Sequence, residues 1–263
     1  MTHPTNYQSA GKRGMPSLVW RAGQDRRLTM IQTVVIPHLH LNKDSRILVD
    51  GCGVGMYVRA LRQFTPHVFG IDIEPDRVAD SHEHSPLVHL AAGENLPYPS
   101  DYFTFILSHE VIEHVQDDAS SVAEMVRVVA PGGRIVIFCP NRLYPFETHG
   151  HYWRGRYYFG NTPLINYLPD ALRNKLAPHV RAYTGYNLRK LITGLPVRII
   201  NHTQIYPGYD NIVARHPTVG RMLRKVTYTL ENTPLKIFGL SHLLVLEKPM
   251  SPMVGMQSPV PVK

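Results

Sequence analysis

The residues with the clearest chemical potential stand close together near the middle of the chain. Glu110, Glu113 and His114 fall at positions i, i+3 and i+4, on one face of a helical turn. His149 and His151 follow a short distance downstream. Carboxylates and imidazoles are ligands of divalent cations, and an imidazole is also suited to removing a proton near neutral pH. This stretch therefore predicts a metal site or a site for acid–base chemistry.

The two kinds of site use overlapping sets of residues. The candidate metal ligands are Glu110, Glu113, His114 and His149. The candidate catalytic bases are His109, His114, His149 and His151. In a third interpretation, which stays open, His149 and His151 are surface or lid histidines that form only local hydrogen bonds.

A glycine-rich stretch upstream predicts a nucleotide-type site. A short apolar run ends at Asp50, and the glycines Gly51, Gly53 and Gly55 follow at alternate positions. Such a run suits a strand buried on both faces of a parallel sheet, and glycines at its end let the backbone approach a ligand closely. A helix expected at 54–64 would point its N-terminal amides into the same crevice. An ordinary strand-to-helix turn would also use glycines, and the spacing is not GxGxxG.

A second carboxylate strengthens this interpretation. Asp72 lies 22 residues after Asp50, at the end of a second apolar run. A carboxylate in that place can accept hydrogen bonds from both hydroxyls of a ribose. The alternative is a solvated turn aspartate before Pro75.

The elements that must position these residues alternate between strand and helix. This rhythm predicts an α/β fold with a doubly wound parallel sheet, in which the carboxyl ends of the strands share one edge. Strands are expected at 46–50, 68–72, 87–91, 103–108 and 134–139, with helices at 20–41, 54–64, 75–81 and 117–129. The segment 130–133 is expected to close the last of these helices. A short helix at 186–195, a strand at 197–206, a basic helix at 219–231 and a strand at 241–247 complete the expectation.

Three segments fall outside this rhythm. Residues 1–17 are expected to form a mobile arm, and the proline-rich residues 249–263 a disordered tail. Residues 142–181 form a long aromatic insertion, which favours a lid over an acceptor. Its aromatic side chains would form the core of the lid and would also favour a ring-bearing or lipophilic acceptor.

The composition of the chain limits where in the cell the protein is expected and which classes of partner it is expected to bind. The chain has 263 residues, no apolar run long enough to cross a bilayer and no signal-peptide core at its start, so a cytoplasmic protein is expected. Its two cysteines, Cys52 and Cys139, are expected to be buried thiols. A net charge of +8 without a block of like charges does not favour nucleic acid as the partner, but it is compatible with peripheral contact with an anionic membrane or with a solvated basic face. The oligomeric state is unknown from these features.

Four stretches in the same order resemble a class I S-adenosylmethionine-dependent methyltransferase of the small-molecule, type 11-like branch. They are VDGCGVG, GIDIEP, ENLPYPSDYFTFILSHEVIEHV and RVVAPGGRIVIFCPN, within 46–141. The resemblance implies a Rossmann-like, doubly wound sheet of seven strands, mostly parallel with an antiparallel last strand. It assigns 18–248 to the methyltransferase domain.

The resemblance also implies roles for particular residues. The cofactor S-adenosyl-L-methionine would contact Asp50, Gly51, Cys52, Gly53, Gly55, Asp72, Ile73, Gly93, Glu94, Asn95 and Ser108. Some relatives with an E-x-x-E-H stretch use a divalent metal to orient acceptor hydroxyls, whereas others with similar stretches do not. The chain departs from the family pattern at Val49, Ala92 and Thr104, where acids are usual.

The function expected from the resemblance is methyl transfer to a small-molecule acceptor, most readily an oxygen of a ring-bearing or lipophilic metabolite. The alternatives are an RNA methyltransferase, suggested by the basic second half, and a non-catalytic cofactor-binding module. A dinucleotide-binding oxidoreductase is a further alternative, but the absence of a GxGxxG motif argues against it.

Overall fold

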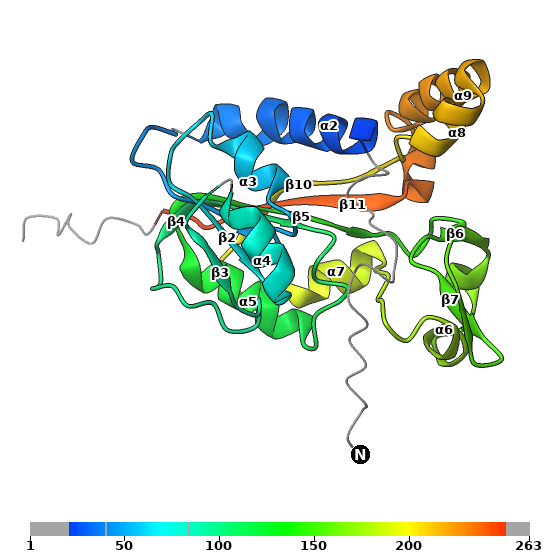
Figure 1. Ribbon diagram of the computed structural model, residues 1–263, viewed down its shortest axis with the longest axis horizontal. Coiled ribbons are helices and arrows are strands. Elements are labelled where there is room, and N and C mark those ends of the chain that lie inside the picture. Colours follow the sequence, from blue (N-terminus) through cyan, green and yellow to red (C-terminus); the bar gives the residue numbers. More distant parts are fainter. Residues whose placement is uncertain (1–20, 40, 84, 251–263) are drawn as a thin grey trace, which may run out of the picture.

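The chain forms one seven-stranded sheet with helices on both faces (Figure 1). The computed structural model describes residues 21–39, 41–83 and 85–250. The predicted arm at 1–17 and nearly all of the predicted tail at 249–263 lie outside the described residues.

The strand order is that of a doubly wound sheet. In space the strands are β10 (Arg198–Ile205), β11 (Ser241–Glu247), β5 (Val129–Pro140), β4 (Phe103–His109), β1 (Ile47–Asp50), β2 (Val68–Asp72) and β3 (Val88–Leu90). The pairs from β3 to β5 are parallel, and β11 runs antiparallel to both of its neighbours. The predicted fold class, including the antiparallel last strand, is confirmed.

Successive side chains along the strands alternate between two cores. Val49 on β1 packs in one core with side chains of α3 (Met56–Leu61), whereas its neighbour Leu48 packs in the other core with α5 (Asp118–Val128) and α7 (Gly185–Leu191). Because neighbouring side chains of a strand point to opposite faces, a strand buried on both faces must be apolar throughout. Polar groups are therefore concentrated where the strands end.

The first helix is shorter than expected. A single helix was predicted over 20–41, but the regular helix α2 spans Arg21–Met30 and is followed by a π-helical turn at Ile31–Val35 and a 3₁₀ turn at Ile36–His38. Pro37 lacks a backbone N–H, so the α-helical hydrogen bonding cannot continue through it. Trp20 and His40 lie outside the described residues.

The segment 130–133 was predicted to close a helix, and this was wrong. These residues begin strand β5, and the pairing register with β4 shifts between Phe103 and Phe105. A bulge of this kind accommodates Pro131 and the two glycines that follow it without ending the strand.

The insertion after β5 folds into a small unit of its own. It contains two short antiparallel pairs, β6 (Phe146–Glu147) with β9 (Thr162–Pro163) and β7 (His151–Trp153) with β8 (Arg156–Tyr158), followed by a 3₁₀ turn at Ile165–Tyr167 and helix α6 (Asp170–Leu176). Its centre is polar, because the buried guanidinium of Arg173 donates to Glu147 Oε2 at 2.8 Å and to the carbonyl of Val180 at 2.9 Å.

The aromatic side chains were expected to form the core of this insertion, and for most of them this was wrong. Tyr144 is buried, but six others are more than a third exposed: Phe146, Tyr152, Trp153, Tyr158, Phe159 and Tyr167. The buried ion pair of Arg173 and Glu147 occupies the place that an aromatic core would have filled.

The remaining helices lie as expected, with one addition. Helix α4 (Pro75–His82) follows β2, and α9 (Pro217–Leu230) matches the predicted basic helix, but α8 (Asp210–Arg215) was not predicted. A 3₁₀ turn at Pro234–Phe238 leads into β11. None of the helices in the described part of the chain is long and apolar enough to cross a membrane.

Candidate functional site: the carboxyl edge of the sheet

The glycine loop joins β1 to α3 at the carboxyl edge. Gly51, Gly53 and Gly55 all have positive φ, at 60°, 55° and 80°. A side chain at Gly51 would collide with Val111, whose Cγ2 atom lies 2.4 Å from the ideal Cβ position. A Cβ atom placed at Gly53 would have no described atom within 4 Å. The backbone of Gly53 is thus exposed to open space, as close approach of a ligand requires.

Two side chains hold this loop in place. Asp72 Oδ2 accepts a hydrogen bond from the Gly53 amide at 2.9 Å, and Asp72 Oδ1 accepts one from the Glu74 amide at 2.9 Å. Ser81 on α4 donates to the carbonyl of Gly53 at 2.7 Å. A carboxylate has about four acceptor sites, so Asp72 retains the capacity to bind ribose hydroxyls. Ser81 was missed by the sequence analysis, because a lone serine in a helix carries no distinguishing signal.

Asp50 lies beneath the loop and is almost fully buried. Its Oδ2 atom accepts a hydrogen bond from Ser108, at the end of β4, at 2.8 Å. Gly93 passes so close that a Cβ there would stand 3.1 Å from Asp50 Oδ1. Burial raises the pKa of Asp50 to about 6, although the Ser108 hydrogen bond opposes the rise. Asp50, Ser108 and Gly93, each expected to contact the cofactor, therefore form one packed group.

The other predicted cofactor residues differ in how they are placed. The side chain of Ile73 is 51% exposed after β2, and Leu90 on β3 is 58% exposed. Leu90 was not predicted. Asn95 is exposed, whereas Glu94 braces the loop after β4 by accepting from the Gln116 amide at 2.7 Å.

Cys52 turns away from the open side of the loop. Its thiol is buried beside Ser81, with 3.7 Å between the Sγ and Oγ atoms, and burial raises its pKa to about 12. Its amide donates to the carbonyl of Ile71. Cys52 and Cys139 are both buried free thiols, as predicted.

The turn after β4 is shaped by an ion pair with α2. Glu110 has a φ of +55°, a conformation that costs energy for a residue with a side chain. Its Oε1 atom lies 3.2 Å from a guanidinium nitrogen of the buried Arg27 and accepts from Ser241 at 2.8 Å. Burial alone would raise the pKa of Glu110, but the charge of Arg27, with smaller contributions from neighbouring groups, lowers it to about 2.

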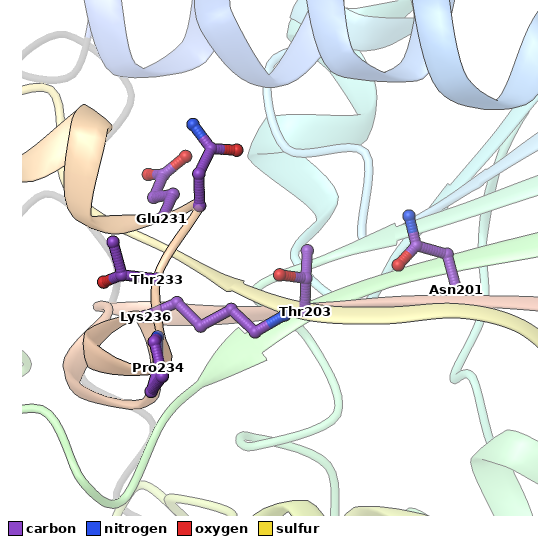
Figure 2. Close-up of a pocket in the computed structure, with 7 residues that line it drawn as sticks. Asn201, Thr203, Glu231, Thr233, Pro234 and Lys236 are labelled. Atoms are coloured by element: carbon purple, nitrogen blue, oxygen red, sulfur yellow. The ribbon is translucent and has the colours of Figure 1, made fainter.

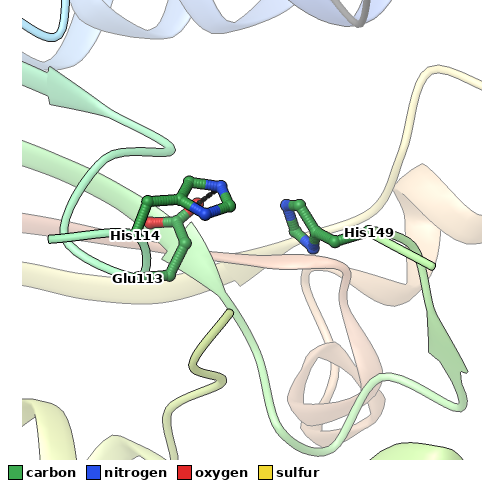
Figure 3. Close-up of side chains that lie close together, drawn as sticks. All are labelled: Glu113, His114 and His149. Atoms are coloured by element: carbon green, nitrogen blue, oxygen red, sulfur yellow. Dashed lines mark ion pairs between the residues drawn. The ribbon is translucent and has the colours of Figure 1, made fainter. Parts of the chain in front are cut away.

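The predicted metal ligands are brought together only in part. Ligand atoms of Glu113, His114 and His149 all lie within 4.8 Å of one another, and Figure 3 shows the imidazole of His149 directed toward the other two side chains. His114 Nε2 is 4.0 Å from Glu113 Oε1, and the ring centroids of His114 and His149 are 5.3 Å apart. Glu110 is engaged by Arg27 and Ser241 and does not belong to this cluster.

The chemistry of this cluster fits a divalent cation. Both carboxyl oxygens of Glu113 are buried without a hydrogen-bond partner among the described residues. Burial, followed by the nearby charge of Glu110, raises the pKa of Glu113 well above its usual value, which favours the protonated, neutral carboxyl group. Desolvation, reinforced by His149, lowers the pKa of His114, which keeps its imidazole neutral. Neutral imidazoles and an unpartnered carboxyl group are what a bound cation would convert into ligands.

The other two histidines lie elsewhere. The ring of His109 packs between Tyr57 and Phe138, at centroid distances of 5.0 and 5.4 Å, and burial lowers its pKa to about 3. His151 belongs to β7, where its Nδ1 atom is 3.0 Å from the hydroxyl of Thr162 and its ring stacks on Tyr158. Of the two downstream histidines, His149 is therefore the one that meets the turn after β4.

Two hollows in the surface lie away from this cluster. Figure 2 shows a polar hollow of about 550 Å³ between β10 and the segment after α9, lined by Asn201, Thr203, Glu231, Asn232, Thr233, Pro234 and Lys236. A larger one, of about 1000 Å³, borders α5, α6 and α7 and includes Asp118 and Arg181. Neither contains the glycine loop or any of the three clustered residues.

Comparison with known proteins agrees with this geometry. Residues 48–137 match a family profile described as "Methyltransferase domain". Over 104 residues the chain is 36% identical to norajmaline N-methyltransferase of Rauvolfia serpentina, which covers 36% of each protein. It is also 36% identical over 104 residues to a ubiquinone biosynthesis O-methyltransferase of Aeromonas salmonicida, covering 37% of this chain and 44% of that one. The chain spans about half or less of the length of the curated relatives it matches.

A solved structure shares the fold. An S-adenosylmethionine-dependent methyltransferase from Mesorhizobium loti superimposes with a TM-score of 0.57 at 17% identity, over 86% of this chain and 97% of that one. The predicted resemblance to class I S-adenosylmethionine-dependent methyltransferases is confirmed by these matches.

The two roles of glycine in the loop can be separated by experiment. Gly53→Ala should destabilise the fold by about 1–2 kcal/mol, because the residue has a left-handed backbone conformation. The added methyl group should also weaken binding of S-adenosylhomocysteine by about 5- to 100-fold, the equivalent of ~1–3 kcal/mol of steric overlap. Isothermal titration calorimetry measures the binding and urea denaturation the stability.

Gly194→Ala is the matched control, since Gly194 also has positive φ and also has open space around its Cβ position, but lies in the turn before β10. It should lose similar stability and keep full affinity. Equal losses of affinity in the two variants would show that Gly53 has no special relation to the ligand.

The buried Asp50 should make stability depend on pH. Its folded-state pKa of about 6 is raised from 3.8, so its contribution to stability is fully present below pH 3.8 and is lost as the pH rises through 6. Asp50→Asn removes this titration and can still accept from Ser108. The stability of the variant relative to the native chain should therefore improve by about 2.4 kcal/mol between pH 4 and pH 7, at ~1.4 kcal/mol per pKa unit. Urea denaturation at a series of pH values measures this difference, and a flat difference would contradict the assignment.

Proposed function

We propose that this chain, whose residues 48–137 match the profile of a methyltransferase domain, transfers a methyl group from S-adenosylmethionine to an oxygen of a ring-bearing or lipophilic small molecule. The observation that supports the choice of oxygen is the cluster of Glu113, His114 and His149, because methylation of a hydroxyl needs a group that removes its proton or withdraws its electrons. Sequence similarity does not decide this point, since an N-methyltransferase and an O-methyltransferase match the chain equally well.

Bound S-adenosylmethionine supplies an electrophilic methyl group on a positively charged sulfur. The task of the protein is then to hold the acceptor oxygen in line with that carbon, since positioning accounts for much of the rate of a displacement. Gly53 presents its backbone to the open side of the loop, and Asp50 places a carboxylate beneath it. Above pH 6 Asp50 is ionised, which favours a cationic cofactor.

His149 is the residue best placed to accept the proton of the acceptor. Its Nδ1 atom lies 3.3 Å from Glu147 Oε1, and its backbone amide donates to the same oxygen at 2.9 Å. Burial would raise the pKa of Glu147, but hydrogen bonds and charge from His149, with the charge of Arg173, lower it to about 2. A carboxylate at Nδ1 keeps the proton there and leaves Nε2 as the basic nitrogen.

The same cluster would hold a divalent cation if one is used. Glu113, His114 and His149 would be the ligands, and the ion would orient acceptor hydroxyls and lower their pKa. Because burial raises the pKa of Glu113 and favours its protonated form, a cation bound to the carboxylate would displace that proton.

Cofactor binding tests the first part of the proposal. S-adenosylhomocysteine at about a hundred times its dissociation constant should stabilise the protein by ~2.7 kcal/mol, or roughly 5–10 °C in melting temperature for a chain of this size. NAD at the same concentration should produce no shift. A shift with NAD alone, or with neither ligand, would remove the methyltransferase interpretation.

Activity variants test the role of His149. With a panel of phenols and catechols as acceptors, release of S-adenosylhomocysteine should show turnover, and His149→Ala should lower kcat by about 10²–10⁴-fold, the usual contribution of a general base. His151→Ala is the control and should retain full activity, because His151 bonds within the lid. Turnover only with amine acceptors would contradict O-methylation.

Glu113→Gln separates the two uses of the cluster. The amide resembles the neutral carboxyl group, so activity that persists in this variant and is insensitive to a chelator would indicate a base without a metal. Loss of activity together with loss of Mg²⁺ or Mn²⁺ binding by calorimetry would indicate a metal site.

A further inference from the structure

Helix α9 carries an apolar stripe that the fold leaves uncovered. Val219, Met222 and Val226 are 56%, 64% and 53% exposed. They occupy positions i, i+3 and i+7, which align on one face of a helix. Three exposed apolar side chains in register are more than the scattered surface residues that any protein shows.

Another side of α9 packs against the protein, so this stripe faces outward. Gly220 contacts α8 so closely that a Cβ there would lie 2.6 Å from the Cα of Val213. Thr227 is buried, and the guanidinium of Arg26 on α2 lies over the ring of Tyr228 at 3.7 Å.

The charges around the stripe are positive. The α9 sequence contains no acidic residue, and Arg215, Arg221 and Lys225 on α8 and α9 are exposed. The two acidic residues nearest in sequence are already engaged, Asp210 with Arg224 and Glu231 with Arg26. The surface of α8 and α9 therefore combines exposed apolar side chains with net positive charge.

The β7–β8 hairpin repeats this combination. Trp153 is 54% exposed and Phe159, just after β8, is 62% exposed. Arg154 and Arg156 are exposed between them, and no acidic residue occurs from His151 to Phe159. In Figure 1 the hairpin and the α8–α9 pair both lie at the right-hand end of the molecule, beyond the carboxyl edge of the sheet.

We propose that α9 and the β7–β8 hairpin dock this end of the molecule onto an anionic lipid bilayer. Arginine, lysine and interfacial aromatic side chains suit the headgroup region, and an apolar helical stripe suits the acyl boundary beneath it. RNA would satisfy the cations but would leave Val219, Met222 and Val226 in water. A second copy of the chain would satisfy the apolar stripe but would bring the same positive charges face to face.

Docking has a consequence for the acceptor. The carboxyl edge of the sheet would face the membrane, so a lipophilic acceptor could reach it without crossing water. This consequence rests on the proposed function, whereas the docking itself does not.

Vesicle flotation of the full chain tests the proposal. The protein should float with phosphatidylcholine vesicles that contain about a quarter phosphatidylglycerol and should not float with pure phosphatidylcholine. The bound fraction should fall steeply as salt is raised to about 0.5 M, because the cations act within a Debye length of the surface. Absence of flotation at low salt would overturn the proposal.

Substitutions on α9 locate the surface. The triple variant Val219→Ser, Met222→Ser, Val226→Ser should bind vesicles at least about tenfold more weakly, because apolar burial at the interface is lost. The double variant Arg221→Gln, Lys225→Gln should lose about fivefold per cation, equivalent to ~1 kcal/mol each. Vesicle binding by the triple variant equal to that of the native chain would overturn the role of α9.

Trp153→Ser tests the hairpin separately and should also weaken binding; an unchanged affinity would remove the hairpin from the docking surface.

The matched controls are Tyr186→Ser, at an exposed apolar residue on α7, and Arg59→Gln, at an exposed cation on α3. Both variants should float like the native chain. Unchanged melting curves and unchanged stabilisation by S-adenosylhomocysteine show that each variant is folded. They also separate failure of docking from failure of the proposed function.

Two further outcomes would replace the bilayer with another partner. Binding of an RNA oligonucleotide that is as tight as vesicle binding and survives the triple serine variant would indicate a nucleic-acid surface. A native dimer that the triple variant converts to a monomer in size-exclusion chromatography would indicate a second copy of the chain.

Discussion

Burial of the sheet on both faces is the constraint on which the rest of the structure depends. Each central strand packs against helices above and below it, so β1 is apolar until Asp50 and β4 is apolar from Phe105 to Leu107. Within the central strands β1, β2 and β4, polar groups that accept or donate hydrogen bonds gather at the carboxyl ends, because there the backbone and neighbouring loops supply partners. Asp50, Asp72 and Ser108 all occupy such ends. The site is thus a consequence of the architecture as much as of the individual residues.

Electrostatics at this edge follow from which carboxyl groups have partners. Glu110 is held by Arg27 and Ser241, and the charge of Arg27 lowers its pKa, whereas burial raises the pKa of Glu113, whose carboxyl oxygens have no hydrogen-bond partner among the described residues. The pKa values of two carboxyl groups three residues apart therefore shift in opposite directions, because one of them meets a guanidinium from the first helix. The unpartnered carboxyl group lies beside His114 and His149, where it could take part in accepting a proton or a cation.

The insertion and the α8–α9 pair extend the sheet edge outward. The insertion places His149 against the turn after β4 through the Glu147–Arg173 ion pair at its centre, and six of its aromatic side chains are more than a third exposed. A polar centre with an apolar exterior is the reverse of the usual arrangement, and it is consistent with a surface that meets something apolar. Helix α9 also carries exposed apolar side chains at this end of the molecule. The proposed access of the acceptor and the proposed attachment to a membrane would therefore use the same end of the protein.

Much of the fold could be predicted from the sequence. The strands 68–72 and 241–247 were predicted with their observed limits, because short apolar runs between glycines and prolines have few alternatives. The glycine loop after the first strand was also predicted, whereas the roles of Asp50, Gly93 and Ser108 in binding the cofactor stay predictions. The segment 130–133 was misjudged, because proline and glycines end a helix and form a strand bulge with equal ease.

Only the tertiary structure decided which distant groups meet. Sequence spacing placed Glu110, Glu113 and His114 on one turn, but it could not show that Arg27 would remove Glu110 from the cluster. It offered His149 and His151 as equivalents, but His149 precedes β7 and joins Glu113 and His114, whereas His151 begins β7 and lies beside Thr162 of β9. Local patterns determine elements because they depend on neighbours in the chain, whereas partners such as Arg27, Ser81 and Glu147 are selected by packing between elements far apart in sequence.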